Sequence, residues 1–190
     1  MAKVGLKNIY VAKVLSDDEN GTTYDTPRKL KPAMTVKISP NYETAELYGD
    51  DQLQEVEEAL SGVDVEFGVN ELDNEDYAYI FGKTLDANGG IVDKASDSAP
   101  YLAFGYELPF SGGRGSKFVW LYKGKFTLPS EENQTKQGST NFQTPTISGK
   151  FMPRASDGVW RYFVESKSTN SEVTSTWFDE VKEPPVTNGF

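Results

Sequence analysis

The 190-residue chain contains no cysteine and no histidine. Their absence excludes Ser-His-Asp and Cys-His catalytic groups, because the imidazole or the thiol that each needs is missing. It also excludes disulfides and zinc sites of the usual Cys/His type. A chain without cysteine is indifferent to the redox state of its compartment, so the compartment stays open on this criterion.

Basic residues and long apolar runs are also scarce. Lys and Arg number 19 against 29 Asp and Glu, which gives a net charge of −10. This argues against a protein that grips nucleic acid, since that function needs a basic face. No stretch approaches the roughly 20 apolar residues of a membrane helix. The segment Met1–Val4 has no apolar signal region, so we expect folding in a cytoplasm and no membrane partner.

Aromatic residues, by contrast, are plentiful, with ten Tyr, eleven Phe and three Trp, which is enough for a real core. Most apolar residues alternate with polar ones, and this is the period of β-strands. The alternation predicts strands over 4–15, 34–38, 63–69, 102–108, 118–122 and 160–164. Apolar residues on both faces of 118–122 predict a strand that is covered on both sides.

Two helices are predicted. The first spans Asn74–Phe81, where acidic residues follow a capping position, Tyr77, Ile80 and Phe81 form an apolar stripe, and Gly82 ends the helix. A second short helix is expected near Gln52–Leu60. Many short strands with frequent turns are typical of a sandwich or barrel. One turn, Ser156–Gly158, is expected to close a hairpin.

Two regions differ from the packed strands. Residues 20–48 contain three prolines and few large apolar side chains, which predicts a long loop of the kind that often mediates contacts. Residues 166–190 are rich in Ser, Thr and Asn, with a strand-like stretch at 173–178 before Pro184-Pro185. We therefore expect a β-sandwich domain over 1–165, with the loop at about 20–48 and the helix at about 74–82, followed by a C-terminal strand or arm.

Four local motifs have both a functional and a plain structural interpretation. The acidic cluster at Asp50–Glu58 could bind a cation or supply glycosidase carboxylates, but sequence neighbours on a strand point to opposite faces. Asp17–Gly21 lacks the spacing of a calcium loop. Gly112–Lys117 has its Lys after the Ser, unlike a phosphate loop. The aromatic strand 118–126 could stack bases or sugars, although such residues are more often core. We predict no enzyme, catalytic residue, cofactor or metal site.

Several blocks, in order along residues 4–160, resemble the major tail protein family of long-tailed, non-contractile bacteriophages. They are Val4–Tyr10 with Ala12-Lys13, Leu47–Asp51, Trp120–Phe126, Gln134–Lys136, Phe142–Gly149, Pro153-Arg154 and Gly158–Trp160. The resemblance implies a structural virion protein with a β-sandwich and one flanking helix. Such subunits form stacked rings, usually hexameric, that make the tail tube through which DNA is ejected. It implies as partners the chain itself, the tail terminator, tape measure and distal tail proteins, and passing double-stranded DNA that is not specifically bound.

Two sets of residues are predicted for this role. Asp64 and Glu66, on the polar face of the 63–69 strand, are candidates for the channel wall, where negative charge would repel DNA. Leu47, Tyr48, Asp50 and Asp51 are candidates for inter-subunit or inter-ring contacts. Two alternatives stay open: a non-catalytic β-sandwich that binds a carbohydrate or protein, which would remain monomeric, and a carboxylate-dependent glycosidase, which needs two carboxylates about 5–10 Å apart in one cleft.

Overall fold

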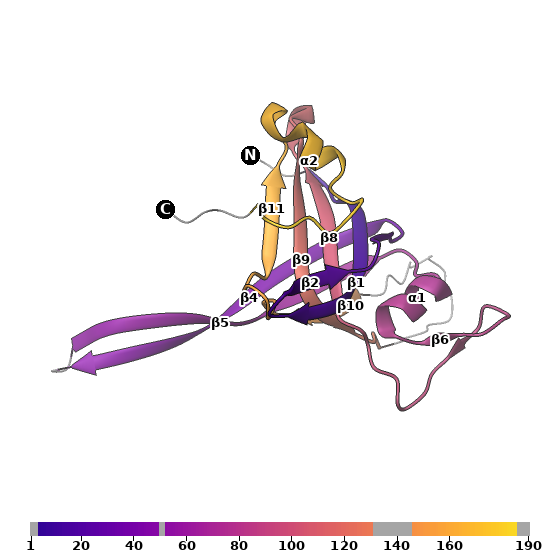
Figure 1. Ribbon diagram of the computed structural model, residues 1–190, viewed down its shortest axis with the longest axis horizontal. Coiled ribbons are helices and arrows are strands. Elements are labelled where there is room, and N and C mark those ends of the chain that lie inside the picture. The colour runs from indigo at the N-terminus through magenta and orange to yellow at the C-terminus, as the bar shows by residue number, and fades with distance from the viewer. Residues whose placement is uncertain (1–3, 50–51, 131–145, 186–190) are drawn as a thin grey trace, which may run out of the picture.

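The fold is built on one antiparallel sheet with a long projecting hairpin (Figure 1). The computed structural model describes residues 4–49, 52–130 and 146–185, with the backbone alone described for 45–49 and 52–56. Within these residues nine strands share the sheet, in the order β2-β1-β8-β9-β10-β5-β4, with β3 beside β1 and β11 beside β9. Their bounds are β1 Lys7–Asp18, β2 Gly21–Tyr24, β3 Arg28–Lys29, β4 Ala33–Gly49, β5 Gln52–Val69, β8 Leu102–Pro109, β9 Ser116–Thr127, β10 Thr146–Phe151 and β11 Arg161–Glu165.

The main core lies inside the curl of this sheet. Val63, Val65 and the two apolar residues that follow at alternate positions of β5 are at most 1% exposed. The ring of Phe67 lies 5.1 Å from that of Phe104 and 5.0 Å from that of Phe126. β5 and β8 are separated by two strands in the sheet, so this contact requires strong curling. The predicted mainly-β, sandwich-like fold is confirmed.

The helix α1, Asn74–Phe81, covers one end of this core and confirms the first helix prediction. Gly82 ends it in the left-handed conformation with φ 66°, and its N–H donates to the carbonyl of Ala78. Asp73 occupies the capping position but makes no side-chain cap bond, and its carboxylate pairs with Lys31 at 2.8 Å instead. A small separate hairpin, β6 Thr84–Leu85 with β7 Ile91–Val92, follows the helix.

A second core lies on the opposite face of the sheet. There Trp120 and Tyr122 of β9 are covered by Trp177, Phe178 and Val181. The Trp120 indole donates to the Trp177 carbonyl at 3.1 Å, and the Tyr122 hydroxyl donates to the Lys182 carbonyl at 2.7 Å. The chain arrives there through η2, Ser168–Asn170, and α2, Ser171–Ser175. β9 is therefore covered on both faces, as predicted.

Four local predictions are corrected. Residues 52–60 begin β5 and are not a helix, and most of residues 20–48 form β2, β3 and β4 and not a loop. The strand expected at 173–178 is instead the end of α2 and a turn that inserts Trp177 into the second core. β10 and β11 both pair with β9, so Ser156–Gly158 joins them without closing a hairpin between them. The domain boundary at residue 165 stays a prediction.

Candidate assembly and channel surfaces

The most prominent surface feature is the distal part of the β4–β5 hairpin, which projects from the sheet (Figure 1). β10 pairs with β5 only over 63–68, whereas β4 and β5 continue to pair with each other as far as Gly49 and Gln52. From Asn41 and Gly62 outward to Gly49 and Gln52, the described hairpin is therefore a two-stranded ribbon made of β4 and β5 alone. Tyr42 is 56% exposed, and Glu43, Glu57 and Glu58 are also exposed.

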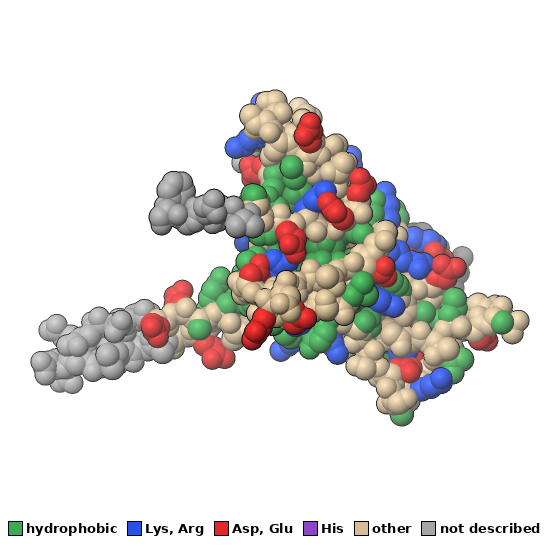
Figure 2. Space-filling view, viewed as in Figure 1, with side chains coloured by type: hydrophobic (Ala, Val, Ile, Leu, Met, Phe, Trp, Pro, Cys, Tyr) green, Lys and Arg blue, Asp and Glu red, His purple; other side chains and the backbone are tan. Residues whose placement is uncertain are grey.

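Every charged side chain of the ribbon is acidic. It contains no Lys or Arg, and the acidic residues within 42–60 are Glu43, Glu46, Asp50, Asp51, Glu55, Glu57 and Glu58. Figure 2 shows red side chains and no blue ones on its coloured part. In register, Glu43 faces Ala59 and Glu58 faces Thr44, so neither directly opposes another carboxylate. The ribbon thus carries negative charge without cross-strand repulsion at these two pairs.

Two of the four predicted contact residues, Leu47 and Tyr48, lie near the far end of the described part of this ribbon. Leu47 pairs with Glu55, and Tyr48 with Leu53, in the backbone register. Asp50 and Asp51 lie outside the described residues, between Gly49 and Gln52 in the chain. The prediction that these four residues make contacts between subunits is not tested by a single subunit.

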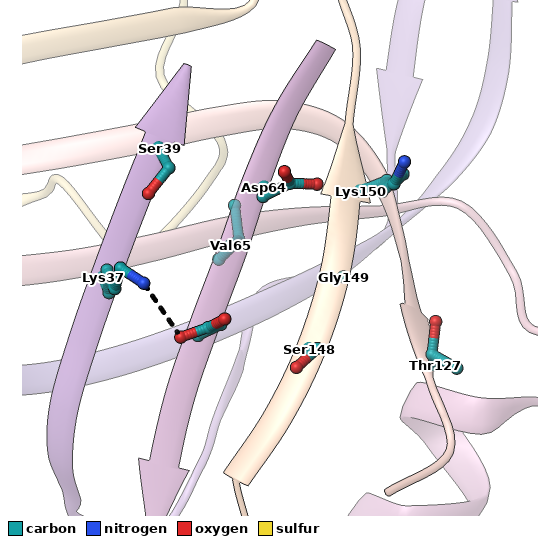
Figure 3. Close-up of a pocket in the computed structure, with 9 residues that line it drawn as sticks. Lys37, Ser39, Asp64, Val65, Thr127, Ser148, Gly149 and Lys150 are labelled. Atoms are coloured by element: carbon teal, nitrogen blue, oxygen red, sulfur yellow. Dashed lines mark ion pairs between the residues drawn. The ribbon is translucent and has the colours of Figure 1, made fainter. Parts of the chain in front are cut away.

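The second surface is an open polar face on the sheet, where the hairpin joins it (Figure 3). Asp64 and Glu66 both lie on this face, as the alternation predicts, while Val63, Val65 and Phe67 point into the core. Asn41 donates to the Asp64 carboxylate at 2.7 Å. The Glu66 carboxylate lies 3.5 Å from the Lys37 ammonium. Sequence reasoning missed two lysines on this face, Lys37 and Lys150, because they lie on β4 and β10 and not on β5.

A model of the phage tail tube protein family matches residues 1–181 of the chain. The chain belongs to the phage tail tube protein family. This confirms the resemblance and makes the protein a structural component of the tail. No curated protein matches the chain. No helix within the described residues is long and apolar enough to span a bilayer.

The tail tube protein also contains buried charges that hold the segment around Glu183 and the loop at 155–156 in place. Arg154, whose side chain is 3% exposed, pairs with Asp157 and lies 2.6 Å from the Glu183 carboxylate. Its guanidinium stacks 4.1 Å from the centre of the Tyr122 ring. Arg154 therefore ties the C-terminal segment to β9. The sequence drew attention to this residue only as part of the Pro153-Arg154 block.

A second buried charge is the carboxylate of Asp17, near the end of β1. Its side chain is 4% exposed and pairs with Lys123. It also accepts the backbone N–H of Ala155 at 2.9 Å and the hydroxyl of Thr22 at 2.8 Å. Burial alone would raise the pKa of Asp17, but the Ala155 N–H and Lys123 outweigh it and hold this pKa well below 3.8. Asp17 thus organises a turn and the loop 155–156, and is not part of a calcium loop.

We predict an acid-dependent effect at Asp17. Because its folded pKa lies below the unfolded value, its contribution to stability is present above about pH 4 and is lost as the pH falls further. Asp17→Asn should lower the free energy of unfolding by about 2–4 kcal/mol at neutral pH. Urea unfolding of both proteins at pH 7 and pH 3 should show the difference shrinking in acid. Glu19→Gln, an exposed neighbour, is the control, and a pH-independent difference for Asp17→Asn would contradict the assignment.

Proposed function

We propose that this tail tube protein polymerises into stacked hexameric rings that form the conduit for DNA ejection. Family membership supports the role in the tube. The observation that carries the proposal is the distal ribbon, which projects from the sheet and exposes Tyr42, Glu43, Glu57 and Glu58. An isolated two-stranded ribbon is marginal in water, so we infer that its binding surface lies on another subunit.

The sheet edges support the same proposal. β2 and β4 end the strand order, so among the described strands the outer edge of each has no neighbour. Unpaired edges are templates for pairing with another chain. Pro40 lies on β4, and proline is tolerated on edge strands because the missing N–H would face outward. We infer that neighbouring subunits in a ring extend the sheet through such edges, and that the ribbon contacts a subunit of the same or the next ring.

In this arrangement Asp64 and Glu66 face the channel, and Leu47, Tyr48, Asp50 and Asp51 lie at an inter-subunit or inter-ring contact. We propose that the tube assembles in the host cytoplasm, with the tail terminator, tape measure and distal tail proteins as its partners. Double-stranded DNA is a passing partner that is not specifically bound.

Negative-stain microscopy of the purified full chain tests polymerisation. We expect rings and tubes, with six-fold symmetry in averaged end views. A monomer at the highest attainable concentration would instead favour the binding-module alternative.

Asp50→Ala with Asp51→Ala tests the contact residues. We expect the double variant to form tubes at least several-fold less efficiently, scored by pelleting and microscopy, because it removes two charges from the proposed contact. Glu172→Ala with Asp179→Ala removes the same charge at two exposed positions outside the sheet and the ribbon, and should assemble normally. Equal assembly of both double variants would contradict a contact at Asp50 and Asp51.

A further inference from the structure

The open polar face contains more lysine than the sequence pattern of β5 alone suggests. Four strands present outward residues in two rows across the sheet. In the backbone register, one row is Lys37, Glu66, Ser148 and Thr127, and the other is Ser39, Asp64, Lys150 and Lys125. Among these residues three lysines stand against two carboxylates. The face is therefore not acidic, although the chain as a whole is.

The pairing of these charges has little value for stability. The side chains of Lys37 and Glu66 are 69% and 46% exposed, and their charged atoms lie 3.5 Å apart. Exposed pairs of this kind contribute about 0–1 kcal/mol. Lys150 is exposed and is the register partner of Asp64 on the neighbouring strand. The arrangement consequently matters mainly for the charge that the face presents to solvent and to a partner.

The shape of the face leaves these charges accessible. Ser39, Ser148, Thr127 and Gly149 are small, and they form a shallow hollow between the longer side chains (Figure 3). Lys125 and Lys150 are register partners whose backbones lie about 5 Å apart on adjacent strands, and the Lys125 ammonium lies 4.5 Å from the centre of the Tyr101 ring. Duplex DNA carries a charge about every 3.4 Å along each strand, so lysines at this spacing could contact neighbouring phosphates if nothing competed for them.

We propose that Asp64 and Glu66 compete with DNA phosphates for Lys37 and Lys150, so that this face meets duplex DNA with balanced charge and does not hold it. The inference rests on the proposed function, because it takes the passing DNA as the partner of this face. It replaces the expectation of a simply repulsive acidic wall. Asp64 and Glu66 are both fixed on β5, between the strands that carry Lys37 and Lys150. Neutralisation of these lysines therefore does not depend on counterions.

Asp64→Asn with Glu66→Gln tests the proposal in the free full-length protein. Both substitutions keep the side-chain shape and remove the two carboxylates of the face, including the Glu66 partner of Lys37. Fluorescence anisotropy with a duplex of about 30 base pairs should show binding that the wild-type protein lacks. Two new phosphate contacts predict a log–log salt slope of about −1.8, so affinity should fall about 60-fold between about 20 and 200 mM salt.

Two controls make the result specific to this face. Glu57→Gln with Glu58→Gln changes the net charge equally but on the projecting ribbon, and should gain no binding. Adding Lys37→Gln and Lys150→Gln to the Asp64/Glu66 double variant should abolish the gain. No gain in the first variant, or an equal gain in the Glu57/Glu58 control, would overturn the proposal. Circular dichroism checks that each variant is folded.

Tube formation is scored separately by microscopy on the same proteins. A gain of DNA binding in a protein that never forms tubes would support the charge balance and contradict the proposed function. Normal tubes with no gain of binding would contradict the charge balance alone. The two failures are therefore distinguishable.

Discussion

Deleting residues 44–58 is expected to abolish tube formation while leaving the subunit folded. Glu43 and Ala59 are register partners, so an Asn-Gly pair inserted between them closes a two-residue hairpin without disturbing the strands that remain. The base of the hairpin, including Val63 and Val65, stays in the core. The deleted part is flanked by exposed residues and belongs to a ribbon that only its own two strands hold together, so its removal should cost the subunit little stability.

The measurement combines thermal unfolding with sedimentation and microscopy of the shortened protein. We expect a melting temperature within a few degrees of the wild type and a species that remains monomeric. A shorter deletion of residues 46–56, with the same Asn-Gly pair between the register partners Ala45 and Glu57, should give an intermediate or equally severe loss. Tubes of normal appearance from the 44–58 deletion would show that the ribbon is dispensable for polymerisation.

The hydrophobic pattern of the sequence correctly predicted those strands and the helix whose apolar residues recur with a clear period. The alternation at 63–69 and the stripe of Tyr77, Ile80 and Phe81 each correspond to an observed element. Residues 52–60 were misassigned because Leu53, Val56 and Leu60 have helix-like spacing. Their backbone instead pairs along its length with β4, a tertiary interaction that outweighs local preference. Pro27 and Pro32 likewise suggested a loop, although they lie just outside strands β3 and β4.

The two residues predicted for the channel wall lie together on the polar face of the sheet, but that face is not acidic as expected, and its place in the channel stays a prediction. Asp64 and Glu66 share the polar face of β5, which alternation on one strand suffices to predict. Lys37, Lys125 and Lys150 join them only because β4, β10 and β9 pair in a particular register. Strand order and register across sequence separations of this size cannot be read from composition, so the net charge of −10 was a poor guide to this surface.

The C-terminal segment was expected to be a strand or arm, yet its described part contributes a large side chain to the second core. Trp177 is fully buried, with its ring 5.3 Å from that of Tyr162 and 6.0 Å from that of Phe118. Single aromatic residues in a Ser/Thr-rich stretch give no periodic signal, so the sequence could not reveal this docking. The packing holds the described C-terminal residues against the sheet through Trp177, Lys182 and Glu183.

Replacing Trp177 with Ala should therefore be severely destabilising. Truncating a buried Trp costs about 3–5 kcal/mol, which corresponds to a fall in melting temperature of roughly 10 °C for a domain of this size. The substitution would also uncover Trp120 and Tyr122, which are fully buried in the wild-type protein, and this adds to the loss of stability. Urea unfolding and thermal melts measure the change directly.

Trp177→Phe is the matched control. The Trp177 indole N–H has no hydrogen-bond partner among the described residues, so replacing it with Phe removes an unpaired donor while keeping most of the aromatic contact. The Trp120 indole bonds to the Trp177 backbone carbonyl, and both variants retain that acceptor. We expect Trp177→Phe to cost less than about 1.5 kcal/mol. If Trp177→Ala were as stable as Trp177→Phe, the C-terminal segment would be a loosely attached arm, as the sequence alone had indicated.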